Sequence, residues 1–146
     1  LPGETIEESF KTILFNARCK PEFPGFSIFQ PYPNTVIADY AVRNGFFNGN
    51  FDNVNANFLK SSVLNYSAEE KKELENLVKL SIMTAKLPFL APLVKSLIKL
   101  PRNKLYDFIY MMFYGWSEWK IYSITVDSPL ESIRLFKKFS KYVFGK

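Results

Sequence analysis

Histidine is absent from this sequence, and cysteine occurs only once, at Cys19. Without histidine the chain offers no Ser-His-Asp or Cys-His arrangement and no zinc site built on imidazole. A single cysteine can form neither a disulfide within the chain nor a cluster of thiolate ligands, and we interpret Cys19 as an ordinary reduced cysteine. The sequence thus excludes the commonest metal centres and the commonest acid–base side chain.

Long hydrophobic runs are also missing. The most apolar stretch, residues 108–117, is flanked by charged residues and covers roughly half of the length that a bilayer span requires. Glu4, Glu7 and Glu8 occupy positions where a signal peptide would need basic and apolar residues. We therefore expect a cytoplasmic protein, with peripheral attachment to a membrane as the alternative.

Aromatic and apolar residues are plentiful. The 146 residues are 47% hydrophobic and 17% aromatic, which favours one folded domain with a core over disorder. This aromatic share is typical of a large core, of an apolar pocket, or of a surface that another domain or a membrane covers. The net charge is +5, yet no nucleic-acid-binding module is recognisable, so nucleic acid is not an expected partner.

The N-terminal region carries clear helix signals. Thr5 and Glu8 have the spacing of a capping box, in which side chain and backbone bond reciprocally at a helix start. Apolar residues then recur at helical spacing until Pro21, which cannot continue the helix. The spacing predicts an amphipathic helix over residues 5–20.

A strand and a second helix are predicted next. Residues 25–30 (Gly-Phe-Ser-Ile-Phe-Gln) are aromatic and β-branched between proline-rich flanks, which is typical of a buried parallel strand. Residues 35–45 are expected to form a helix with Asn44-Gly45 as its C-cap. Because a parallel strand finds no partner within this chain, we expect residues 25–30 to lie exposed or to pair across a homo-oligomer.

The rest of the sequence divides into a connector and a helical region. Residues 46–66 are rich in Asn and Phe, and we interpret them as a connector loop, with a functional loop as the alternative. Residues 67–146 predict helices only. One starts at the capping box Ser67-x-x-Glu70 and ends before Pro88, one runs over 89–100, one over 103–125, and one starts at Ser128.

The last predicted helix, residues 129–146, is basic on one side. Arg134, Lys137, Lys138 and Lys141 lie opposite an apolar stripe. We interpret the basic side as the solvated face of a packed helix. An anionic membrane surface or an acidic partner bound to this face is the alternative.

Two turn motifs in this chain resemble those of a known enzyme family. Leu1-Pro2-Gly3-Glu4-Thr5 is similar to the G-L-P-G-E-T turn of radical S-adenosylmethionine (SAM) enzymes, and Pro31-Tyr32-Pro33-Asn34-Thr35 is similar to their P-Y-P-G-T turn. The resemblance is strongest to the subgroup with an N-terminal cobalamin-binding domain, and within it to Fe–S oxidoreductases of the anaerobic Mg-protoporphyrin IX monomethyl ester cyclase type. It covers residues 1–45 by motif and the helical tail more loosely.

The helix signals predict a fold class that is mainly α, and the resemblance implies how its parts divide. Residues 1–45 would be an α-β-α remnant at the end of a partial (β/α)6 barrel, residues 46–66 the connector, and residues 67–146 a helical C-terminal extension. The three-cysteine motif that binds the [4Fe-4S] cluster in this family is missing here. It would lie in a missing N-terminal part of the same chain, so this fragment is expected to bind no cofactor and to be inactive alone. SAM, the cluster and, as an open question, cobalamin would belong to the parent protein.

The resemblance also suggests which residues contact SAM. In parallel α/β barrels ligands bind at the carboxyl ends of the strands, which places six residues at the rim of the SAM pocket. These are Gly3, Glu4, Gln30, Pro31, Tyr32 and Asn34. Asn34 stands where the family motif has glycine, and asparagine is the residue type after glycine that best tolerates positive φ. A rigid turn is the alternative interpretation of Pro31 and Pro33, and we predict no catalytic or metal-binding residue.

Three hypotheses for function follow. The chain would close the barrel and shape the SAM and substrate cavity of a radical SAM cyclase or methyltransferase. Alternatively, it is a helical module that docks on an anionic membrane or acidic protein through residues 129–146. A third hypothesis, a small enzyme that uses Glu118 or Asp127, is disfavoured because the sequence has no histidine and no paired-acid motif. The substrate is not indicated by the sequence.

Overall fold

The computed structural model describes residues 1–54, 59–122, 134 and 137, and these residues are mainly helical. The helices are α1 (Ile6–Cys19), α2 (Val36–Arg43), α3 (Ala68–Lys86), α4 (Ala91–Leu97) and α5 (Lys104–Tyr122), and two short 3-10 helices are η1 (Phe51–Asn53) and η2 (Pro88–Leu90). No strand occurs within this part of the chain. The prediction of a mainly α fold is confirmed.

The two long helices α1 and α3 begin at the predicted capping boxes. The Glu8 amide donates to Thr5 Oγ1 at 3.2 Å, and the Thr5 amide donates to the Glu8 carboxylate at 2.8 Å. Ser67 and Glu70 repeat this arrangement at 3.2 and 2.9 Å. Because the first N–H groups of a helix have no partner inside the helix, these reciprocal bonds determine where α1 and α3 start.

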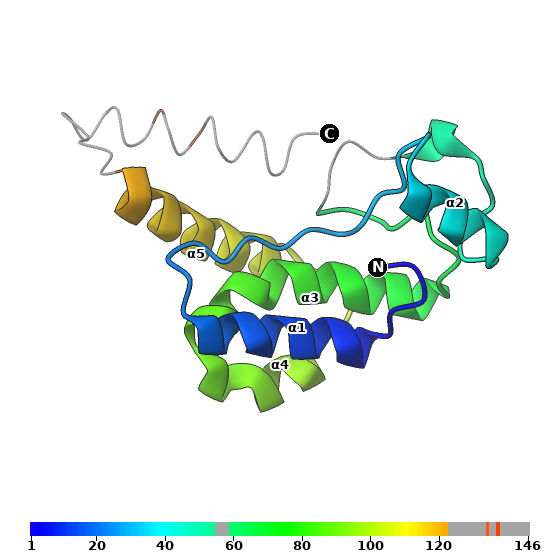
Figure 1. The fold of residues 1–146 in the computed structure, drawn as a ribbon. Coiled ribbons are helices and arrows are strands. Elements are labelled where there is room, and N and C mark those ends of the chain that lie inside the picture. Colours follow the sequence, from blue (N-terminus) through cyan, green and yellow to red (C-terminus); the bar gives the residue numbers. More distant parts are fainter. Residues whose placement is uncertain (55–58, 123–133, 135–136, 138–146) are drawn as a thin grey trace.

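Four of the helices form the main bundle. α3 lies at its centre and packs against α1, α4 and α5 (Figure 1). The core of the bundle is built from aliphatic and aromatic side chains of all four helices, namely Phe10, Ile13, Leu77, Leu80, Ala85, Ala91, Val94, Ile98 and Tyr106. Because several helices surround α3, its buried residues spread around its circumference instead of along one stripe.

Residues 20–35 cross the bundle on the way from α1 to α2 (Figure 1). Residues 25–30 form no strand within the described part of the chain, because a strand needs a second strand for its backbone and this part of the chain supplies none. The predicted exposure is wrong. Ile28 packs against Val78 and Ile82 and is 3% exposed, and Gln30 is 6% exposed. A homo-oligomer through this segment stays a prediction.

α2 lies apart from the main bundle (Figure 1). It is the helix predicted over residues 35–45, and its N-cap is Thr35, whose hydroxyl accepts a bond from the Ala38 amide at 3.3 Å. The described ends of the predicted connector, residues 46–54 and 59–66, contribute to packing against it, so that Ala41, Phe47 and Leu64 form a small separate core. We call α2, this connector and this core the α2 unit.

The C-terminal helices follow the predicted order. α4 and α5 correspond to the helices predicted over residues 89–100 and 103–125, and α5 continues unbroken through Gly115. The predicted helix 129–146 and its basic face lie outside the described residues, except that Arg134 and Lys137 are helical and exposed. Within the described ranges, no helix has both the length and the apolar character needed to span a bilayer.

Candidate functional site

A cavity of about 260 Å³ lies between the N-terminal turn, α1, the crossing segment and α3. Its walls are mainly apolar, with Ile13 of α1, Ile28 of the crossing segment and Leu77 of α3 among them. The polar groups of the lining are Glu4, Ser9, Thr12, Ser27, Ser62, Tyr66 and Ser81. Cavities of this kind, apolar with a few polar groups, are the usual form of small-ligand sites, and this one is slightly smaller than their usual volume.

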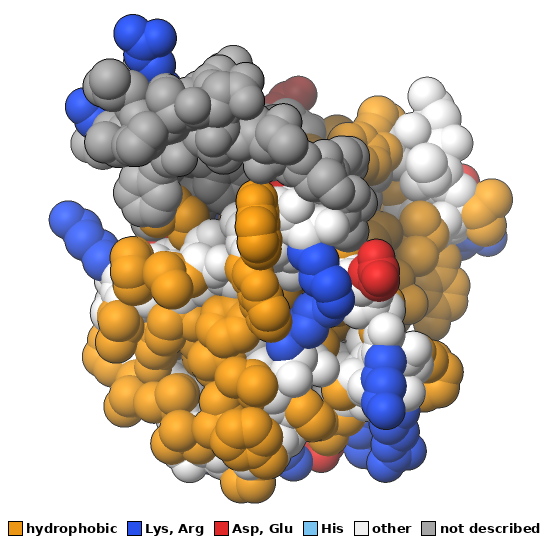
Figure 2. Space-filling view, turned by 90° about the vertical axis from the view of Figure 1, so that its left-hand side faces the viewer, with side chains coloured by type: hydrophobic (Ala, Val, Ile, Leu, Met, Phe, Trp, Pro, Cys, Tyr) orange, Lys and Arg blue, Asp and Glu red, His pale blue; other side chains and the backbone are white. Residues whose placement is uncertain are grey.

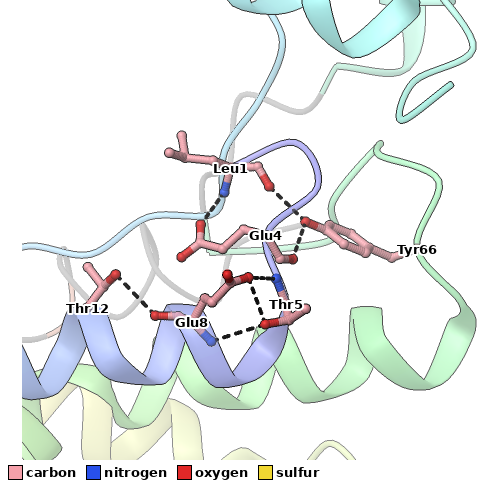
Figure 3. A network of polar contacts seen from close by, with 6 residues as sticks. All are labelled: Leu1, Glu4, Thr5, Glu8, Thr12 and Tyr66. Carbon is pink, nitrogen blue, oxygen red and sulfur yellow. Dashed lines mark hydrogen bonds and ion pairs between the residues drawn. The ribbon is translucent and has the colours of Figure 1, made fainter. Parts of the chain in front are cut away.

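Tyr66, which lines the cavity, bonds to the N-terminal turn (Figure 3). Its hydroxyl lies 2.9 Å from the carbonyl oxygen of Leu1 and 3.1 Å from that of Glu4, and it donates to these two acceptors. The Glu4 carboxylate turns toward the Leu1 amino group at 2.5 Å. Burial, reinforced by the negative charges of Glu4 and Glu70, raises the pKa of Tyr66 above its usual value. The hydroxyl therefore remains a protonated donor at neutral pH.

Several polar groups of the lining are already bonded within the chain. Ser81 Oγ donates to the Val78 carbonyl at 2.6 Å, and Thr12 Oγ1 donates to the Glu8 carbonyl at 3.2 Å. Glu4 is the only acid in the lining within the described residues. The cavity can therefore enclose an apolar or aromatic group and accept a hydrogen bond at Glu4, and its lining carries no paired acid and base.

Gly3 of the predicted site serves packing in this structure. Its φ is +81°, and a β-carbon at this position would come within 2.9 Å of the Phe46 ring. Both the backbone conformation and the close approach require glycine. Gly3 thus joins the N-terminal turn to the α2 unit, and Glu4 is the one predicted site residue that lines the cavity.

Gln30 is buried and only partly satisfied. Its Nε2 donates to the carbonyl oxygen of Ser61 at 3.1 Å, whereas its Oε1 is buried without a hydrogen-bond partner among the described residues. A buried acceptor left unpaired costs roughly 1–3 kcal/mol, so a donor that reaches it would be bound favourably. Pro31, the next residue, is also buried.

Tyr32 and Asn34 lie on the surface, outside the cavity. Tyr32 is 60% exposed. Asn34 has a φ of +63°, so the positive φ expected of this asparagine is confirmed. The structure does not gather the six predicted residues into one site: Glu4 lines the cavity, Gln30 and Pro31 are buried, and the others serve turns or face solvent.

Tyr66 is the main residue that sequence reasoning missed. It is the last residue of the connector and directly precedes the capping box at Ser67, where no local pattern distinguishes it from the other aromatic residues. Its bonds reach more than sixty positions back along the chain. The aromatic residues of 46–66 were the one signal in the sequence that this stretch makes packing contacts with the rest of the fold.

The Asn-rich connector borders a second, polar hollow of about 400 Å³. Three of its asparagines are engaged in local structure. Asn48 Oδ1 accepts from the Asn50 amide at 2.9 Å, Asn50 Oδ1 accepts from the Asp52 amide at 3.1 Å, and Asn65 Nδ2 donates to the Gly45 carbonyl at 2.9 Å. These bonds shape turns, which agrees with the interpretation of residues 46–66 as a connector.

Metal ligands do not cluster in the part of the chain that the structure describes. Cys19 is exposed at the end of α1. Of the two carboxylates considered for an independent enzyme, Glu118 is half-buried on α5 and Asp127 lies outside the described residues. Comparisons of the chain with protein-family models, with curated proteins and with solved structures gave no match.

Proposed function

We propose that this chain is the C-terminal part of a radical SAM Fe–S oxidoreductase of the cobalamin-binding subgroup, of the cyclase or methyltransferase type. The observation that carries the proposal is the conformation of the two turn motifs. Gly3 and Asn34 both have positive φ, and each turn leads into a helix capped by a threonine, Thr5 or Thr35. Turns of this kind connect strand ends to helices at the ligand-binding face of α/β barrels.

In the proposed parent, α1 is the fifth barrel helix, residues 25–30 are the sixth strand and α2 is the sixth helix. The backbone of residues 25–30 supports this assignment, because no backbone–backbone hydrogen bond within the described residues engages it. Unpaired N–H and C=O groups in a half-buried segment favour pairing with a strand supplied from elsewhere. The rest of the barrel would supply that strand.

Two side chains suit contacts with SAM. SAM presents hydrogen-bond donors through its adenine amino group, its ribose hydroxyls and its ammonium group. The unpaired Oε1 of Gln30 and the carboxylate of Glu4 are acceptors for such donors. When bound, SAM and the cluster held by cysteines outside this chain would supply the radical chemistry. The residues of this chain would bind, orient and enclose the reactants.

The first test is to read the coding sequence upstream of Leu1. We expect an in-frame motif of three closely spaced cysteines, and a start codon immediately before Leu1 would refute the proposal. The second test uses the full-length protein, purified without oxygen and reconstituted with iron and sulfide. It should show the electron paramagnetic resonance signal of a reduced [4Fe-4S] cluster and should convert SAM to 5′-deoxyadenosine when a reductant is added.

Variants of the full-length protein test the two acceptors separately. Gln30→Leu removes an acceptor, and Glu4→Gln replaces a charged acceptor by a neutral one, so each should weaken SAM binding by roughly tenfold. Tyr40→Phe, on the exposed side of α2, is the control and should bind SAM like the wild type. Unchanged binding by Gln30→Leu in an active enzyme would disprove the role of Gln30 and leave the family assignment intact.

A further inference from the structure

α5 carries an exposed apolar stripe that the bundle does not use. Leu105, Phe108, Met112, Trp116 and Trp119 recur every three or four residues and are 47–60% exposed. Other residues of the helix, such as Tyr106 and Ser117, are buried on the side that packs on α3. A contiguous row of five large apolar side chains marks a contact surface, whereas scattered ones do not. We call this row the α5 stripe.

The edges of the α5 stripe are positively charged. With 3.6 residues per turn, Lys104 and Lys120 fall on its two sides, and both are exposed. The acids of the helix lie further round. Asp107 pairs with Lys79 of α3 at 2.7 Å, and Glu118 is half-buried. The stripe therefore offers apolar side chains between two cations to whatever covers it.

Apolar surface continues beyond α5. Figure 2 views the bundle from the end where α1 and α3 finish, and hydrophobic side chains cover much of the lower surface of that end. Phe89 of η2 and Leu93 of α4 are 74% and 54% exposed. The exposed apolar residues thus extend over more than one helix of the bundle.

We propose that the α5 stripe docks on the surface of an anionic lipid bilayer. Its Trp, Phe, Met and Leu side chains would enter the headgroup region, and the Lys104 and Lys120 ammonium groups would reach the lipid phosphates. Tryptophan is enriched at the membrane–water interface, and both tryptophans of the sequence lie on this stripe. The stripe is about 21 Å long, so it would lie along the surface.

The charge pattern favours lipid over a second copy of the chain. Pairing two α5 stripes would bring their lysines together around an apolar contact, which opposes association. An anionic surface attracts the same lysines. This inference is independent of the proposed enzymatic function, because it rests on α5 alone.

Intrinsic tryptophan fluorescence tests the inference directly, because Trp116 and Trp119 are the only tryptophans in the chain. The full 146-residue chain is titrated with vesicles of phosphatidylcholine and phosphatidylglycerol in equal amounts, and with pure phosphatidylcholine vesicles. We expect a blue shift and co-sedimentation with the anionic vesicles at low salt, and a loss of both at high salt. Absence of both at low salt would overturn the inference.

Two double variants identify the surface that binds. Phe108→Ser with Met112→Ser keeps both tryptophans and should abolish the blue shift. Lys104→Gln with Lys120→Gln should weaken partitioning by about 25-fold, since each lysine near an anionic surface contributes roughly fivefold. Val36→Ser, at an 83% exposed apolar position on α2, is the matched control and should bind like the wild type. Circular dichroism checks that every variant is folded.

Two further outcomes would contradict the inference. A blue shift that appears without vesicles as protein concentration rises, together with a dimer in sedimentation, would assign the stripe to a second copy. Vesicle binding that survives Phe108→Ser with Met112→Ser and is lost in Lys137→Gln with Lys138→Gln would assign the contact to the basic residues 129–146.

Discussion

Gly3 and Phe46 approach each other so closely that a β-carbon on Gly3 would lie 2.9 Å from the Phe46 ring. This contact joins the N-terminal turn to the α2 unit, and it occurs where the backbone has a φ of +81°. The positive φ and the close contact with the ring therefore each require glycine at position 3.

Gly3→Ala should lower the free energy of unfolding by about 1–3 kcal/mol, because alanine is strained at positive φ and must displace the ring. Urea unfolding followed by circular dichroism measures the change. Gly115→Ala is the matched control. Gly115 is helical with nothing near its missing β-carbon, so alanine there should raise stability by up to about 1 kcal/mol. Equal effects of the two substitutions would contradict the role of the Gly3–Phe46 contact.

Tyr66→Phe should lower the free energy of unfolding by about 1 kcal/mol at neutral pH, since it removes the hydroxyl that bonds to Leu1 and Glu4. The raised pKa of Tyr66 gives this difference a pH dependence. The folded state holds the phenolic proton more tightly than the unfolded state, so the stabilisation is full below about pH 10 and is lost as pH rises through the folded pKa.

Urea titrations of the wild type and of Tyr66→Phe, from neutral pH to beyond the tyrosine range, should therefore converge at the alkaline end. Tyr32→Phe is the control, because Tyr32 is 60% exposed and its removal should change little at any pH. Parallel curves for the wild type and Tyr66→Phe would show that the hydroxyl bond is not formed.

The capping-box acids should make the protein sensitive to acid. Bonds from the backbone amides of Thr5 and Ser67, and then from their hydroxyls, lower the pKa of Glu8 and Glu70. Because the folded-state pKa is lowered, the stabilisation is present above the ordinary carboxyl pKa and is lost as pH falls through the lowered value.

Glu8→Gln with Glu70→Gln should be less stable than the wild type at neutral pH, and the two proteins should become equally stable in acid. Thermal unfolding at a series of pH values measures the difference. Glu69→Gln removes an acid from the same first turn of α3 that has no part in the capping box, so it should have a smaller effect. A difference that persists in acid would mean that ionised carboxylates do not cap the helices.

Arg102→Ala should destabilise the protein by about 1–3 kcal/mol, because it leaves a buried carboxylate without its cation. Glu75 is 6% exposed, and its carboxylate accepts bonds from Arg102 Nε at 2.6 Å and from the Ser61 amide at 2.8 Å. Glu7→Ala breaks the exposed ion pair with Lys95 and should cost less than about 1 kcal/mol. Chemical denaturation of both variants tests whether the loss of the buried ion pair lowers the free energy of unfolding more than the loss of the exposed one.

Local signals made much of this fold predictable. Both capping boxes lie where the sequence placed them, and Asn34 adopts the positive φ expected of it. These features depend on residues within three or four positions of each other. The strand predicted over residues 25–30 depends on something else, because an extended apolar segment becomes a strand only if a second strand meets it. Here helices α3 and α5 bury its side chains instead.

The candidate site was less predictable than the fold for the same reason. Of the six residues suggested by the family resemblance, Glu4 lines the cavity. Tyr66 and α3 supply other parts of the lining, and their distance along the chain from the N-terminal turn hides these contacts from any local pattern. The resemblance suggests Gln30 as a site residue, but no local pattern predicts its bond to Ser61, which lies 31 positions further along the chain.

The α2 unit is separate from the bundle, and this separation should let it unfold locally. α2 makes no extensive contact with another helix among the described residues, and its own core contains few buried side chains. Units of this kind unfold locally at a lower free energy than the core. We expect the amide hydrogens of Val36–Arg43 to exchange with deuterium by local opening, well before those of the buried part of α3 exchange by global unfolding.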